Sequence, residues 1–193
     1  GTIILPGVQG GAQWEHGAAD PETGMIYVGS ATQPSLVALE KSDESDMDYV
    51  AARGNVPSVD GIPITKPPYG RITALDLKAG TIAWQVPNGD TPPAIANHPL
   101  LKGVTLPRTG SRSRAGLVAT RTLLFAGEGW GGQPFFRALD KRTGATIGET
   151  RLPGVQTGLP MTYMHEGRQY VAFTVGEQDR VPAMLVAYAL PRE

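Results

Sequence analysis

The sequence predicts an all-β fold, and three observations carry this prediction. Short apolar runs bounded by turn residues recur from MIYVGS at 25–30 to AMLVAYAL at 183–190, a pattern typical of strands. No stretch of about 12 residues has helical periodicity, and the only helical fragments that the sequence allows are short, around 36–44 and in HPLLKG at 98–103. The chain also contains 25 Gly and 17 Pro without a collagen-like period, which indicates many turns.

The apolar segments give the expected strands in chain order. They are MIYVGS (25–30), RITALDL (71–77), TIAWQV (81–86), GLVATRTLLFAG (116–127), PFFRALD (134–140), ATIGETRL (145–152), MTYMHEGRQYVAFTV (161–175) and AMLVAYAL (183–190). Two stretches between them, about 32–68 and 87–113, are rich in Pro, Gly, Asp and Ser and are expected to be irregular. Loops longer than about 15 residues usually have a function or pack on something else, so these stretches predict a rim, a lid or a contact with a neighbour.

Composition excludes several classes of protein. A length of 193 residues and a formal charge of −1 fit one soluble domain and give no sign of a nucleic-acid or membrane partner. No run of about 18 apolar residues is present, and residues 1–20 lack the basic start and apolar stretch of a signal peptide. If the protein is exported, we expect its signal upstream of Gly1. The absence of cysteine excludes disulfides, thiolate zinc sites and covalent haem attachment in this segment.

One turn motif occurs twice in the sequence. Ala74, Asp76 and Gly80 are repeated 64 residues later, in ITALDLKAGTIAWQVP and FRALDKRTGATIGETRLP. In each copy the Asp carboxylate can accept backbone N–H groups across the turn, and the Gly can take a positive φ. A similar turn occurs in AADPETGMIYV at 18–28. Sheets of about four strands that repeat every 45 to 65 residues indicate propeller blades, so the sequence predicts about three blades of a β-propeller.

The two copies differ in one large side chain. Trp84 lies in the strand after the first turn, where the small Ala leaves room for its indole to dock on a neighbouring unit. Gly148 stands at the corresponding place in the second copy. We therefore expect the second copy to dock less strongly or to face the closure of the ring.

The frame Ala-x-Asp-x-x-(Thr/Ala)-Gly-x-x-x-Trp resembles the tryptophan-docking motif of the pyrroloquinoline quinone (PQQ) dehydrogenases. Further stretches fit the C-terminal third of that family in order, and its membrane glucose dehydrogenase-like branch looks nearest. They are GGAQWEHGAADPETGMIYV, PPYGRITALDLKAGTIAWQVPNGDTP, HPLLKG, LLFAGEGWGGQPFFRALDKRTG and LPMTYMHEGRQYVAFTVG. The resemblance implies that residues 1–193 form the C-terminal part of one eight-bladed, all-β propeller domain.

The resemblance also implies an activity. These enzymes oxidise an alcohol, sugar or polyol by hydride transfer to PQQ, which a Ca²⁺ ion bridges to the protein, and they pass electrons to a quinone or cytochrome. It implies a location in the periplasm or on the periplasmic side of a membrane. By family order, the calcium ligands and the catalytic base lie upstream of Gly1, so we expect no catalytic residue and no metal ligand in this segment. The remaining blades or a companion chain would be its partners.

Three residues are expected near the cofactor. GGAQW resembles the family pattern Gly-Gly-x-Asn-Trp, in which the amide bonds to the polar edge of PQQ, but Gln13 stands where Asn is usual. The extra methylene moves the amide by about 1.5 Å. Trp14 is either a cofactor neighbour or a core aromatic residue. Trp130, in GEGWGG, has glycines that allow close approach of a flat ligand and would equally suit a tight blade loop.

For the other candidate residues, a structural or solvated role is the alternative to a functional one. His16 could point into the same cavity as Trp14, whereas His98 and His165 are expected to order a loop and to lie at a solvated hairpin tip. The acidic run EKSDESDMDY at 40–49 offers three aspartates to a cation but lacks the Gly and the terminal Glu of an EF-hand loop, and we expect a solvated loop. The arginines of PRTGSRSRAG at 107–116 could bind an acidic partner, but three arginines in a Gly/Ser loop are expected to keep the loop soluble.

The sequence also allows a second class of function, that of an interaction scaffold. Propellers of the same repeat family without cofactor serve as protein-interaction scaffolds in envelope assembly, and a fold alone does not define an activity. A scaffold would need the docking repeats only. The matches at GAQW, PPYG and GDTP lie outside those repeats and favour the enzyme.

Overall fold

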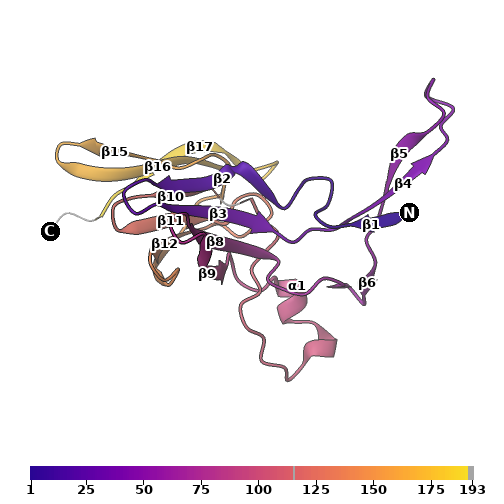
Figure 1. Ribbon diagram of the computed structural model, residues 1–193, viewed down its shortest axis with the longest axis horizontal. Coiled ribbons are helices and arrows are strands. Elements are labelled where there is room, and N and C mark those ends of the chain that lie inside the picture. Colours follow the sequence, from indigo (N-terminus) through magenta and orange to yellow (C-terminus); the bar gives the residue numbers. More distant parts are fainter. Residues whose placement is uncertain (115, 191–193) are drawn as a thin grey trace.

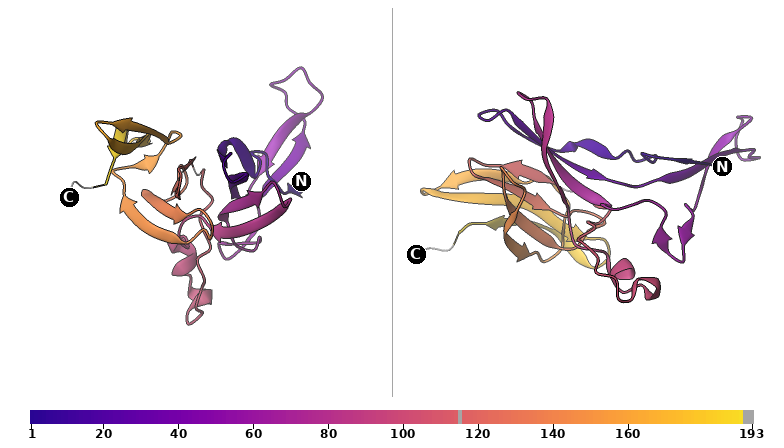
Figure 2. Two further views of the ribbon diagram at one scale, coloured as in Figure 1. Left: turned by 60° about the vertical axis from the view of Figure 1, so that its left-hand side comes forward. Right: turned by 60° about the horizontal axis from the view of Figure 1, so that its bottom comes forward.

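Three antiparallel sheets that follow one another in chain order form most of the fold (Figure 2), and two smaller sheets lie within residues 2–63. The computed structural model describes residues 1–114 and 116–190, excepting the side chains of Trp14 and Glu15. The first sheet has the order β2 (Ala12–Asp20), β3 (Met25–Ala31), β8 (Gly70–Asp76) and β9 (Thr81–Pro87). The second has the order β10 (Leu117–Ala119), β11 (Leu123–Gly127), β12 (Phe135–Asp140) and β13 (Thr146–Arg151). Both are the four-stranded blades that the sequence predicts.

The third sheet is narrower than the other two. It contains β14 (Val155–Gln156), β15 (Met161–His165), β16 (Arg168–Glu177) and β17 (Val181–Tyr188). Both β14 and β15 pair with the same edge of β16, at Val175–Gly176 and at Arg168–Ala172, and β17 pairs with the other edge. The sheet is therefore three strands wide, since two short strands share one row.

The repeated turn has the same geometry in both copies. Asp76 Oδ1 accepts the backbone N–H groups of Lys78 and Ala79 at 2.8 and 3.0 Å, and Asp140 Oδ1 accepts those of Arg142 and Thr143 at 2.8 and 3.0 Å. Gly80 and Gly144 close the two turns with φ of 66° and 74°. The sequence repeat is thus a structural repeat, with each Asp satisfying turn donors that strand pairing leaves free.

Two apolar cores join the sheets. The core between the first and second sheets is formed by Tyr27, Ile72, Ala74, Leu117, Leu124, Ala126 and Leu139, with Trp84 packed against it. The core between the second and third sheets is formed by Phe136, Leu152, Val171, Phe173 and Val175. Each sheet buries apolar residues against its neighbour, which is how blades of a propeller are held together.

Trp84 and a buried ion pair clasp the first sheet to the second. The Trp84 Nε1–H donates to the carbonyl oxygen of Lys141 at 2.9 Å, and its ring lies against Gly144, where an added Cβ would meet Cε3 at 2.7 Å. The Lys141 Nζ donates to Asp20 Oδ2 at 2.5 Å. That hydrogen bond lowers the pKa of Asp20 to about 2. Each contact joins a residue of one sheet to the β12–β13 turn of the next.

The two stretches expected to be irregular have different structures. Residues 32–68 contain β4 (Ser35–Glu40), β5 (Val50–Gly54), β6 (Ser58–Val59) and β7 (Ile62–Pro63), so the expectation of an irregular stretch, and of a helical fragment at 36–44, is wrong there. Strand β4 pairs with β1 (Thr2–Ile4) and β5, and this hairpin projects away from the three sheets (Figure 1). Residues 87–113 form the expected loop, with only α1 (Pro93–Ala96) and the 3-10 helix η1 (Pro99–Leu101). None of the described helices is long and apolar enough to cross a membrane.

Candidate functional site

A cleft lies where the first sheet, the second sheet and the third sheet meet. Its narrow part, of about 40 Å³, and its wide part, of about 570 Å³, share Gln9, His16, Arg114 and Trp130. The narrow part is further lined by Gly10, Gly11, Gln13, Ala31, Gln33, Arg112 and Ser113. The wide part is further lined by Gly116, Gln156, Thr157, Gly158 and Leu159. We call this space the inner cleft, because it is bordered by the inner strands β2 and β14 of the sheets.

Two of the three residues expected near a cofactor meet in the inner cleft. Gln13, on β2, and Trp130, in the loop between β11 and β12, line its narrow part although they are far apart in sequence. Trp14 belongs to β2, and its side chain lies outside the described residues. The fold thus brings the GGAQW and GEGWGG motifs to one place.

The Gln13 amide already has a local partner on its donor side. Its Nε2 donates to the carbonyl oxygen of Gln9 at 2.9 Å, one turn of the chain earlier. This bond uses one of the two N–H groups of the amide, so the other N–H and the amide oxygen can still meet a ligand.

Trp130 presents an accessible indole to the cleft. Its side chain is 62% exposed, unlike a core aromatic residue, and its carbonyl oxygen accepts the backbone N–H of Arg114 at 3.1 Å. The Arg114 guanidinium lies 5.7 Å from the centre of the indole ring. The tight loop and the exposed ring occur together, since Gly131 takes a φ of 91° and passes close to the Arg112 carbonyl.

The inner cleft also contains residues that sequence reasoning set aside. Arg112 and Arg114, from the cluster expected only to keep its loop soluble, line the cleft, whereas Arg108 pairs with Asp90 at 3.0 Å outside it. Gln156 is buried beside Gly116 and Gly127, and its Nε2 donates to the Gly158 carbonyl at 2.9 Å.

The three histidines and the acidic run 40–49 lie in different parts of the structure. His16 is buried and lines both parts of the cleft. His98 orders its loop, as expected: its Nε2 lies 2.7 Å from the Asp60 carbonyl oxygen and its Nδ1 accepts the Leu100 N–H at 3.3 Å. His165 lies exposed at the end of β15. The acidic run 40–49 lies on the projecting hairpin, away from the cleft (Figure 1).

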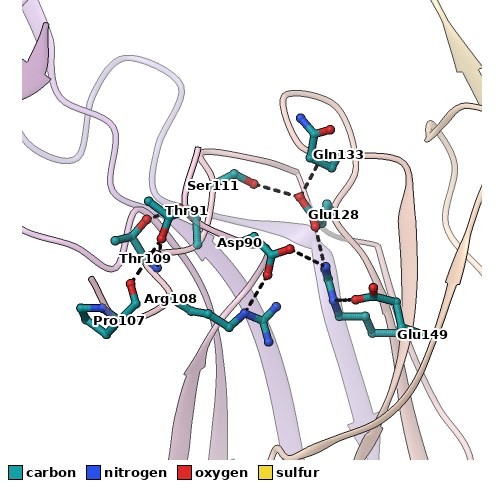
Figure 3. A network of polar contacts seen from close by, with 11 residues as sticks. Asp90, Thr91, Pro107, Arg108, Thr109, Ser111, Glu128, Gln133 and Glu149 are labelled. Atoms are coloured by element: carbon teal, nitrogen blue, oxygen red, sulfur yellow. Dashed lines mark hydrogen bonds and ion pairs between the residues drawn. The ribbon is translucent and has the colours of Figure 1, made fainter. Parts of the chain in front are cut away.

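A buried ionic network supports the loops behind the cleft (Figure 3). The Glu128 side chain has no exposed area, and its Oε1 accepts Arg137 Nη1 at 2.6 Å. Its Oε2 accepts the Ser111 hydroxyl at 3.2 Å and the Gln133 N–H at 2.8 Å. The other side of the guanidinium reaches Glu149 at 2.5 Å. Glu128 therefore joins the loop that carries Trp130 to the loop that carries Arg112.

Within the described part of the chain, no group of three or more His, Cys, Asp or Glu side chains could hold a metal ion. The inner cleft is instead lined, among the described side chains, by amide, hydroxyl, imidazole, guanidinium and indole groups. Such a set can bind a flat, hydrogen-bonding and negatively charged molecule.

Comparison with known proteins agrees with this arrangement. The glycerol dehydrogenase large subunit of Gluconobacter thailandicus is 32% identical over 225 residues, covering 98% of this chain and 30% of the relative. The quinate/shikimate dehydrogenase (quinone) of Acinetobacter baylyi is 30% identical, covering 99% of this chain and 27% of the relative. The quinoprotein glucose dehydrogenase A of Acinetobacter calcoaceticus is 26% identical, covering 99% and 26%. The chain thus spans less than a third of the length of these relatives.

A solved structure shows the same fold. The quinohemoprotein alcohol dehydrogenase from Comamonas testosteroni superposes with a TM-score of 0.64 at 20% identity, covering 97% of this chain and 27% of that one. The sequence pattern of the family described as "PQQ: Glucose/ethanol/alcohol dehydrogenase, beta-propeller domain" matches residues 1–171. The three sheets are therefore blades of a β-propeller, and the chain belongs to the family of PQQ-type glucose, ethanol and alcohol dehydrogenase β-propeller domains.

Proposed function

We propose that this chain is the C-terminal part of the propeller of a PQQ-dependent dehydrogenase, of eight blades when complete. The observation that carries the proposal is the meeting of Gln13 and Trp130 in the inner cleft of a chain that matches the PQQ propeller family over residues 1–171. The oxidised substrate is an alcohol, sugar or polyol. The relatives are named for glycerol, quinate or shikimate, and glucose, so the family alone leaves the substrate unassigned.

The residues of the inner cleft fit PQQ, which is a planar, anionic quinone. The accessible indole of Trp130 offers a flat apolar surface, and Arg112 and Arg114 offer positive charge. The amide oxygen of Gln13 and the hydroxyl of Ser113 add polar groups on the same wall. Fixed donors of this kind orient a flat ligand, while the redox chemistry comes from the ligand itself. PQQ, when bound, supplies a quinone carbonyl that accepts a hydride.

The part played by this chain is then binding and orientation. Trp130 and Gln13 would hold one edge and one face of the cofactor, and Trp14 is a further candidate by its place on β2. The glycine-rich loop 127–132 keeps the indole at the mouth of the cleft, and the buried Glu128 keeps that loop in place. The catalytic base and the ligands of the Ca²⁺ ion would come from parts of the protein beyond this chain.

Partners follow from the exposed surface of the third sheet. Large apolar side chains stand exposed there, among them Met161, Met164 and Leu185, and an exposed apolar face of a blade needs a cover. Further blades of the same propeller, or a companion chain, would supply it. As in the family generally, a quinone or cytochrome would take the electrons, on the periplasmic side of the cell.

The test is reconstitution of the protein that contains this chain. After addition of PQQ and Ca²⁺, a panel of alcohols, sugars and polyols should support reduction of an artificial dye, and omission of PQQ should abolish it. Binding of PQQ is followed separately, by equilibrium titration. A protein that folds but binds no PQQ would overturn the proposal and leave the cofactor-free scaffold as the remaining function.

A further inference from the structure

Two arginines line the inner cleft, the half-buried Arg112 and the exposed Arg114, and they differ from Arg137 and Arg108 in their partners. Arg137 pairs with Glu128 and Glu149, and Arg108 pairs with Asp90. For Arg112 and Arg114, the described residues provide no carboxylate partner within ion-pair distance. These two guanidinium groups therefore keep their charge and their N–H donors available.

Aromatic rings hold both guanidinium groups at the cleft. The Arg112 group lies 5.8 Å from the ring centre of Tyr69, and the Arg114 group lies 5.7 Å from that of Trp130. Tyr69 is buried, so its position is fixed by the core. A guanidinium over a ring still directs its N–H groups outward from its edge, and that edge matches the two oxygens of a carboxylate.

The surroundings also favour an anion. No Asp or Glu occurs among the described side chains that line either part of the cleft. Ser113, between the two arginines in sequence, lines the narrow part, and its buried hydroxyl finds no hydrogen-bond partner in the described part of the chain. Two cations and a hydroxyl without a described partner on one wall attract negative charge, whereas the nearby carboxylate of Glu128 is already paired with Arg137 at 2.6 Å.

We propose that Arg112 and Arg114, with Ser113 between them, form a carboxylate-binding wall of the inner cleft. This deepens the proposed function and rests on it for the choice of source: the carboxylate belongs either to the cofactor or to a hydroxy-acid substrate. In both cases the recognised chemistry is the same. The wall acts by charge-assisted hydrogen bonds, each of which contributes about 1.5 to 3 kcal/mol, equivalent to at least a tenfold change in affinity.

The first experiment uses the PQQ-free protein and citrate as the probe. Calorimetric titration at low salt should show binding that weakens at least tenfold in the double variant Arg112→Gln/Arg114→Gln and weakens with added salt. Arg121→Gln, an exposed arginine in the β10–β11 turn, is the matched control and should bind as the wild type does. Equal citrate affinity in all three proteins would overturn the wall, whether or not PQQ binds.

The second experiment identifies the source in the reconstituted protein. If the wall holds the cofactor, Arg114→Gln raises the Kd of PQQ at least tenfold and leaves KM for every substrate unchanged at saturating PQQ. If it holds the substrate, the Kd of PQQ is unchanged, and KM rises at least tenfold for a hydroxy acid but less than twofold for its neutral alcohol. Arg114→Lys should restore part of either loss. Changes below twofold in both quantities would refute the proposal, and failure of the wild type to bind PQQ would instead refute the proposed function.

Discussion

Removal of the Arg137 side chain should lower the free energy of unfolding by more than the loss of its packing contacts alone would. Arg137 is 2% exposed and Glu128 is fully buried. In Arg137→Ala, Glu128 would retain only the Ser111 hydroxyl and the Gln133 N–H as partners. A buried charge that loses its partner costs about 3 to 5 kcal/mol. We expect a loss of that size in the free energy of unfolding, measured by denaturant titration.

Two comparisons separate charge from packing. Arg142→Ala removes a guanidinium that is 88% exposed and 3.7 Å from Asp140, and it should cost less than about 1 kcal/mol. The double variant Arg137→Met/Glu128→Leu replaces both charges with apolar groups, and it should recover most of the loss of Arg137→Ala.

A loss in Arg137→Ala no larger than that in Arg142→Ala would contradict a buried charge as the cause. So would a double variant as unstable as the single one, because the cost would then lie in lost packing. Either result would remove the buried pair as the support of the loop that carries Trp130.

The clasp between the first two sheets gives the remaining predictions. Trp84→Ala should cost about 2 to 4 kcal/mol, less than for a fully buried Trp, whereas Trp84→Phe should cost only about 1 kcal/mol for the lost hydrogen bond to Lys141. Chemical denaturation measures both losses. A loss below about 1 kcal/mol for Trp84→Ala would argue against docking of the indole. Gly144→Ala should destabilise more than Gly80→Ala, because both have positive φ but only at Gly144 would the new Cβ strike Trp84; equal losses, or a difference that survives in a Trp84→Ala background, would contradict this contact. The pKa of Asp20 is lowered from 3.8 to about 2 in the folded state, so Asp20 stays charged at a pH where the unfolded chain takes up a proton. The free energy of unfolding should therefore fall as pH drops from about 4 to 2. Unfolding midpoints of Asp20→Asn should fall less steeply over that range, and parallel slopes would rule out the ion pair as the cause.

The fold could be predicted where side chains alternate in a simple pattern. Strands such as β3 and β8 bury alternate residues, and the sequence has the matching period of two. Strand β2 was missed because AQWEHGAAD has no such period; its register shifts between Ala12 and Gly17. The hairpin β4–β5 was missed because its short strands project from the sheets and bury no residue, and the segments around them are rich in Pro, Gly, Asp and Ser.

The candidate site could be predicted only in part. Gln13 stood out because GGAQW resembles a family pattern, and Trp130 because its flanking glycines allow close approach of a flat ligand; both line the inner cleft. Arg112 and Arg114 did not, because an arginine in a Gly/Ser loop is usually a solvated residue. What distinguishes them is the aromatic ring beneath each and the absence of a described carboxylate partner, and those depend on contacts between distant segments. Sequence spacing carries no trace of such contacts.

Titration of the reconstituted protein with PQQ, in the presence of Ca²⁺, tests whether the inner cleft holds the cofactor. Binding should be saturable, and Trp130→Ala should raise the Kd about 2- to 12-fold, as expected for loss of one aromatic stacking contact of about 0.5 to 1.5 kcal/mol. Trp84→Phe, which alters the clasp far from the inner cleft, should bind PQQ as the wild type does. Absence of saturable binding, or unchanged affinity in Trp130→Ala, would contradict the placement of the cofactor against this cleft.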